Sequence, residues 1–195
     1  ITEPVDILDR DAFEKELNEL GSLRAKADAI RTRLAKSINT KYQENPAYYE
    51  NFSKRIKEAL ELYKARTITE AEYLAKMRDI LEDYCTGKSA IAYPDRIRAN
   101  VHAQAFYGVL TAIFSNEKLS VEPDFAAEMA LDITTIIEKH SQVDWTHNLT
   151  IHDRISQDID DLFYRYQKEM GLVLSFDVID MIIENVKTVA LRRFA

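Results

Sequence analysis

Apolar residues recur at steps of three and four along most of the chain, the spacing that predicts amphipathic helices. In the segment 46–64, for example, Tyr49, Phe52 and Ile56 fall on one side, and no segment alternates with period two. Eight helices are expected, at about residues 11–20, 22–42, 46–64, 69–85, 94–115, 123–141, 150–170 and 175–194. The pattern therefore predicts an all-α fold, an irregular bundle of about eight helices.

Residues typical of helix ends punctuate this pattern. Thr69 and Glu72 have the spacing of a capping box, in which each side chain satisfies a free backbone N–H. The other expected N-caps are Ser22, Thr150 and Ser175. Helices are expected to begin at Pro46 and Pro94 and to end at Gly21, Gly87 and Gly171. Val101, Met170 and Phe176 continue apolar stripes and are expected to face inward.

The most plausible internal break runs from Gly87 to Tyr93. It would separate two helical parts, residues 1–90 and 91–195, with the helices expected at 22–42, 46–64 and 69–85 in the first and the last four in the second. The break is too short to be a flexible linker, so the two parts are expected to pack as subdomains.

Overall composition narrows the classes of function. The net charge of −7 disfavours binding of nucleic acid by the whole surface, because phosphate is repelled. The single cysteine, Cys85, cannot form an internal disulfide, which is typical of a reducing cytoplasm, so a cytoplasmic protein is expected. No apolar run approaches the roughly 20 residues of a membrane span, so no membrane partner is expected.

Charge is distributed unevenly along the chain. Residues 23–41 carry six basic side chains against one acid, a net charge of +5. The basic residues are Arg24, Lys26, Arg31, Arg33, Lys36 and Lys41. Residues 116–161 carry a net charge of −8. Either the two segments are solvated faces that complement each other, or the basic helix contacts DNA or an acidic partner and the acidic run a basic one.

Two residue patterns resemble known ligand-binding motifs, but both are incomplete. Thr86 to Ser89 resembles the end of a phosphate-binding loop, but Glu82 stands where its first glycine is required. His147 and His152 are five apart, not the three or four of a zinc pair on one helix face. We therefore expect no catalytic, cofactor-binding or metal-binding residue in this chain.

Three other features are expected to have structural roles. The carboxylates of Asp158, Asp160 and Asp161 are typical of a solvated helix face, and Cys85 is expected to be a buried structural residue. Trp145, the sole tryptophan, lies in a short loop between two apolar stripes. We expect it to be a structural anchor where the sixth and seventh helices meet, with an exposed partner contact as the alternative.

Several short motifs resemble the C-terminal helical region of the R (restriction/motor) subunits of type I restriction-modification enzymes. They are residues 27–31 (ADAIR), 44–56 (ENPAYYENFSKRI), 67–74 (TITEAEYL), 143–146 (VDWT) and 166–171 (YQKEMG). Their order and spacing extend the likeness over most of residues 23–189.

The resemblance implies a role for this region in a larger enzyme. In that family the R subunit is a type I site-specific deoxyribonuclease, and its nuclease and helicase-like motor domains use ATP and magnesium. The helical C-terminal domain helps dock the R subunit onto the methyltransferase subunit and, through the methyltransferase subunit, onto the specificity subunit. The nuclease and motor motifs are absent here, so the resemblance implies a non-catalytic assembly domain that meets DNA only in the full complex. The alternative is a helical nucleic-acid-binding domain that uses the basic helix 23–41.

Overall fold

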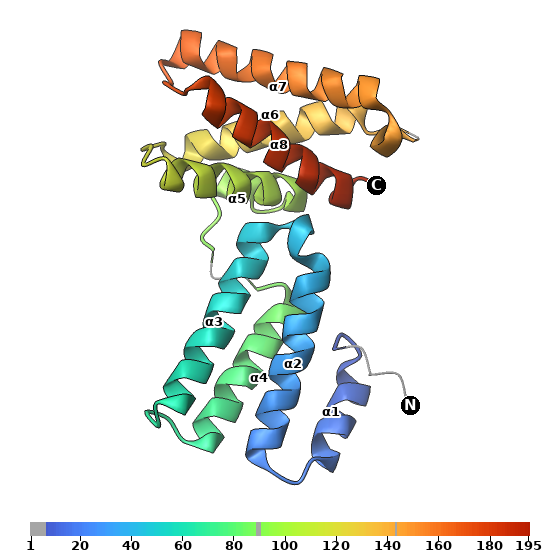
Figure 1. Ribbon diagram of the computed structural model, residues 1–195, viewed down its shortest axis with the longest axis vertical. Coiled ribbons are helices and arrows are strands. Elements are labelled where there is room, and N and C mark those ends of the chain that lie inside the picture. The colour runs from blue at the N-terminus through green and yellow to red at the C-terminus, as the bar shows by residue number, and fades with distance from the viewer. Residues whose placement is uncertain (1–6, 89–90, 143) are drawn as a thin grey trace. The chain divides into compact units, whose positions relative to one another are not determined.

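The computed structural model describes residues 7–88, 91–142 and 144–195. Within them the chain forms eight α-helices and three short 3-10 turns and has no strand, which confirms the all-α prediction (Figure 1). The chain divides into two compact units, residues 1–42 with 48–92 and residues 43–47 with 93–195. Val143 and Ser89, which belong to two of the motifs above, lie outside the described residues.

The first unit contains α1 (Arg10–Glu19), α2 (Leu23–Lys41), most of α3 (Pro46–Lys64) and α4 (Glu70–Thr86). Helix α2 packs on α1 and α4. Helices α3 and α4 are joined by an ion pair between Arg55 and Asp83 at 2.7 Å and by edge-on packing of Phe52 against Tyr84. The unit has its own core, in which Phe13, Ile30 and Tyr73 are among the fully buried side chains.

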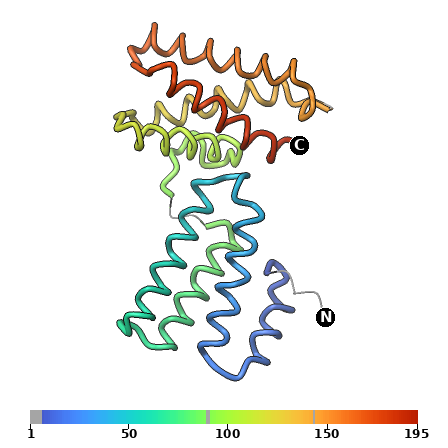
Figure 2. The backbone as a smooth tube through the Cα atoms, viewed as in Figure 1, coloured from blue at the N-terminus to red at the C-terminus, as the bar shows by residue number. Residues whose placement is uncertain are grey.

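The second unit is a four-helix bundle built from α5 (Val101–Asn116), α6 (Pro123–His140), α7 (Leu149–Met170) and α8 (Phe176–Arg193). Each helix packs on the next and α8 packs back on α5, which closes the bundle (Figure 2). Helix α5 is apolar on nearly all sides and is buried from Ala103 to Leu110 with the sole exception of Gln104. It therefore forms much of the core of this unit.

Several helix ends match the sequence prediction. Ser22 and Ser175 cap α2 and α8, and the Thr69–Glu72 capping box is complete, with both reciprocal hydrogen bonds present. Gly87 and Gly171 end α4 and α7 with φ of 69°, in the left-handed region where a side chain is strained. These ends follow local rules of hydrogen bonding and backbone sterics.

The fifth and seventh helices begin elsewhere than predicted. Pro94 opens only the 3-10 turn Asp95–Ile97, and α5 begins at Val101 because the Asn100 side chain accepts hydrogen bonds from the next two free backbone N–H groups, those of residues 102 and 103. In the same way Asn148, not Thr150, caps α7. Asparagine is at least as good an N-cap as threonine and stands earlier in the chain, so it takes the cap.

Four further expectations were wrong. Helix α1 ends at Glu19 with an extended residue after it, so Gly21 is not its left-handed cap. Val101, Met170 and Phe176 are 57%, 60% and 85% exposed instead of facing inward. All three lie at helix ends, where the apolar period continues past the point at which a neighbouring helix covers it.

Candidate functional site

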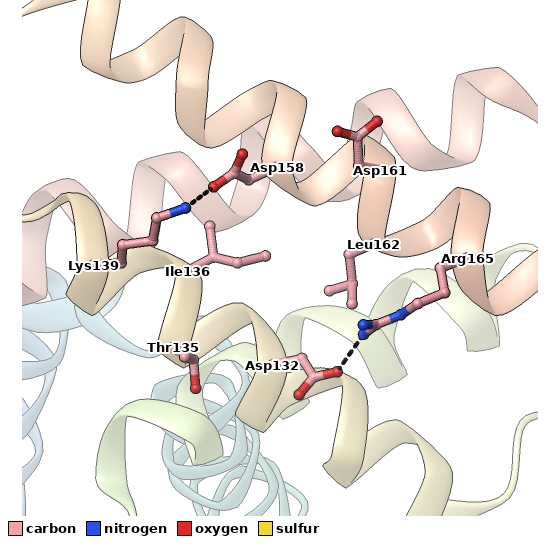
Figure 3. Close-up of a pocket in the computed structure, with 8 residues that line it drawn as sticks. All are labelled: Asp132, Thr135, Ile136, Lys139, Asp158, Asp161, Leu162 and Arg165. Atoms are coloured by element: carbon pink, nitrogen blue, oxygen red, sulfur yellow. Dashed lines mark hydrogen bonds and ion pairs between the residues drawn. The ribbon is translucent and has the colours of Figure 1, made fainter.

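A polar groove lies between α6 and α7, in the second unit, and encloses about 490 Å³ (Figure 3). Four residues from each helix line it: Asp132, Thr135, Ile136 and Lys139 from α6, and Asp158, Asp161, Leu162 and Arg165 from α7. Both sets follow the spacing 0, 3, 4 and 7, which places the four side chains of each helix on one stripe. The two helices run in opposite directions, so the first residue of each row meets the last of the other.

At one end of the groove, Asp132 joins the two helices. Its carboxylate accepts hydrogen bonds from the Arg165 guanidinium at 3.1 Å and from the Tyr166 hydroxyl at 2.8 Å. Burial, followed by the hydrogen bond to Asp132, raises the pKa of Tyr166 above its usual range. The phenol therefore stays protonated and acts as a hydrogen-bond donor, not as a base.

At the other end, Asp158 has two basic partners on α6. Lys139 Nζ lies 2.9 Å and His140 Nε2 lies 2.8 Å from the same carboxylate oxygen. The hydrogen bond from His140, then that from Lys139, lowers the pKa of Asp158. Asp158 is therefore an ion-pair partner, whereas Asp160 and Asp161 are exposed, so the predicted solvated face includes only two of the three carboxylates.

Most of the charged side chains that line the groove pair with one another. Four of its five charged side chains form ion pairs across the two helices, and its apolar part comes from Ile136 and Leu162. Within the described residues, no group of three or more His, Cys, Asp or Glu side chains is arranged to hold a metal ion. What the groove offers a partner is a short, mixed-charge surface with Asp161 on its rim.

The six basic residues of α2 do not gather on one face. At about 100° per residue, Arg24 and Arg31 share one side of the helix and Lys26 and Arg33 lie on the other. Arg24 and Arg31 flank Asp28 at 3.7 and 3.5 Å. Arg33 pairs with a glutamate of α1, Glu16, at 2.8 Å, and Lys36 is exposed while Lys41 is half-buried. Three of the six basic residues of α2 thus have acidic partners inside the first unit, and two of these three share Asp28.

Trp145 lies in the 3-10 turn Trp145–His147 between α6 and α7 and is 2% exposed. Its indole Nε1 donates a hydrogen bond to the backbone oxygen of Phe194, at 2.9 Å, and its ring meets that of His152 edge-on. The ring therefore ties the α6–α7 connection to the end of α8, within one unit.

The remaining candidates occupy structural positions. Gly87 is a helix cap, as described above. Cys85 is half-buried and not buried as expected, because it lies in the last turn of α4, where its thiol is 3.7 Å from the backbone oxygen of Ile7. His147 is exposed in its turn, whereas His152 is half-buried against Trp145. The α6–α7 groove was not anticipated from the sequence; the signal that could have revealed it is the matching 0-3-4-7 spacing in both helices.

The chain is similar in sequence to known proteins. Residues 2–190 match the family described as "Type I restriction enzyme HindI endonuclease subunit-like, C-terminal". The chain is also similar to the type I restriction enzyme HindI endonuclease subunit of Haemophilus influenzae, with 25% identity over 127 residues, which are 65% of this chain and 12% of that protein. No solved structure matches the chain. None of the helices in the described residues combines the length and apolar character needed to cross a membrane.

Proposed function

Because the chain belongs to the family of C-terminal regions of HindI-like type I restriction endonuclease subunits, we propose that it is a non-catalytic assembly domain. In this proposal it docks an ATP-dependent, DNA-translocating nuclease onto the methyltransferase and specificity core. Nuclease and motor activity, with the ATP and magnesium that they use, belong to other parts of the parent polypeptide. The relative is about eight times longer than the region it shares with this chain, which leaves room for those parts.

The observation that carries the proposal is that charged side chains of the α6–α7 groove are paired with one another. In the α6–α7 groove the Asp132, Asp158, Lys139 and Arg165 side chains bind one another across the two helices. A catalytic acid or base needs a pKa near the working pH and a free position for a reacting atom. The pKa of Asp158 moves in the opposite direction, away from neutrality, so the geometry supports a scaffold and not a reaction centre.

The acidic character of the chain supports a protein partner over DNA. The net charge of −7 repels a phosphate backbone, and three of the six basic residues of α2 are already paired with acids of the first unit. A protein surface imposes no such requirement, since its charges can be of either sign. Direct DNA binding by the basic helix is the outcome that the test below has to distinguish.

The test is co-purification with the methyltransferase subunit. We expect the complete endonuclease polypeptide to co-purify with that subunit in the absence of DNA, and a polypeptide lacking residues 1–195 to lose this association. We also expect no magnesium-dependent ATP hydrolysis by the isolated chain. Hydrolysis that is abolished by Lys88→Ala, or association that requires DNA and falls steeply with salt, would contradict the assembly role.

A further inference from the structure

The turn that joins α7 to α8 exposes three large apolar side chains within seven residues. Met170, Val173 and Phe176 are 60%, 82% and 85% exposed. Single exposed apolar side chains are ordinary on a protein surface, but a cluster of them marks a site of interaction. We call residues 170–176 the apolar turn.

The apolar turn has a defined conformation. Gly171 takes a left-handed conformation, and its backbone N–H bonds back to the oxygen of Tyr166. Leu174 is buried in the core of the bundle, and the Ser175 hydroxyl caps α8 by accepting a hydrogen bond from the backbone N–H of Val178 at 3.3 Å. The three exposed side chains are thus held by anchored neighbours, which lowers the entropy that a partner must remove on binding.

Negative charge surrounds this end of the bundle. The α5–α6 connection lies at the same end as the apolar turn (Figure 1), and Phe125 in the first turn of α6 packs edge-on against Tyr166 in the last turns of α7. Across residues 116–124 and 168–177, five acids stand against two bases, a net charge of −3. The acids are Glu117, Glu122, Asp124, Glu169 and Asp177, all of them exposed.

We propose that the apolar turn is the docking surface for a protein partner whose contact patch combines apolar side chains with lysine or arginine. The acidic residues around the apolar turn favour one class of binding partner over the others. DNA and anionic membranes carry negative charge and are repelled, and a second copy of this chain would bring a second acidic surface against the first. A basic and apolar protein patch satisfies both features of the surface at once.

This inference rests on the proposed assembly function, which makes the methyltransferase subunit the partner to test. The probe is the purified methyltransferase–specificity core, and binding is measured with the complete endonuclease polypeptide. The test variant carries Val173→Ser and Phe176→Ser. The matched control carries Val101→Ser and Leu149→Ser, which remove two apolar side chains of 57% and 75% exposure from the first residues of α5 and α7 in the same unit.

We expect the Kd of the test variant to rise at least about tenfold and that of the control to stay within about twofold of wild type, because truncating a central apolar contact costs at least that factor. Since all four side chains are exposed, both variants should keep the melting temperature of the wild type. Replacing Glu169 and Asp177 with lysine should also weaken binding, and the wild-type affinity should fall with salt.

The outcomes separate the two proposals. If the wild type binds the core and the test variant binds equally well, the docking surface is wrong and the assembly function stands. If the wild type does not bind the core at all, both fall. If light scattering shows a wild-type dimer that the Val173→Ser, Phe176→Ser variant loses, the occupant is a second copy and the basic-partner proposal is overturned.

Discussion

Replacement of Trp145 tests whether its ring anchors the second unit. The side chain is 2% exposed, and aromatic side chains of this size bury roughly 150–250 Å². At about 25 cal/mol per Å², and with the alanine methyl retained, Trp145→Ala should lower the free energy of unfolding by about 3–5 kcal/mol. The hydrogen bond from the indole to the Phe194 backbone oxygen adds about 1 kcal/mol to the wild type. Trp145→Phe keeps most of the ring and should therefore cost only about 2 kcal/mol.

The assay is urea unfolding followed by circular dichroism at 222 nm, since the variants lack the only tryptophan. Leu149→Ala is the control: its side chain is 75% exposed at the start of α7, so it should change stability by less than about 0.5 kcal/mol. In the wild type the indole emission should be blue-shifted, as in an apolar environment. A solvated emission maximum, or a loss below about 1 kcal/mol in Trp145→Ala, would refute the anchor and favour a partner contact.

Three further perturbations test the ion pairs and the helix ends. Asp158→Asn should lower the melting temperature at neutral pH. Because the hydrogen bond to His140 lowers the folded pKa of this carboxyl from 3.8, the loss in melting temperature should be full above about pH 5 and shrink as the pH falls below that range. A loss in melting temperature that does not depend on pH would contradict the pairing. Gly87→Ala should cost about 1–2 kcal/mol because its φ is 69°, whereas Gly21→Ala, the control without a positive φ, should cost nothing; equal effects in urea titrations would rule out the strained cap. Arg33→Glu should destabilise the first unit through repulsion with its acidic partner on α1, and a thermal melt like that of the wild type would show that this pair is not needed.

The sequence determined those features that depend on neighbours within about four positions. The capping box at Thr69 and Glu72 and the left-handed stops at Gly87 and Gly171 were readable because each involves one helix end. The all-α class followed from the apolar period in the same way. Where two local signals competed, as at Pro94 and Asn100, the pattern could not rank them, because both can begin a helix and the cap that forms depends on how the following segment packs.

Tertiary structure alone decided which helices meet and which apolar positions stay uncovered. The charged residues of the rows that begin at Asp132 and Asp158 give no sign in the sequence of their partners, and they form ion pairs because α6 and α7 lie antiparallel. Phe176 continues the apolar period of α8, yet it is 85% exposed at the first residue of that helix. Periodicity records which side of a helix is apolar, whereas the length over which that side is covered depends on partners distant in sequence.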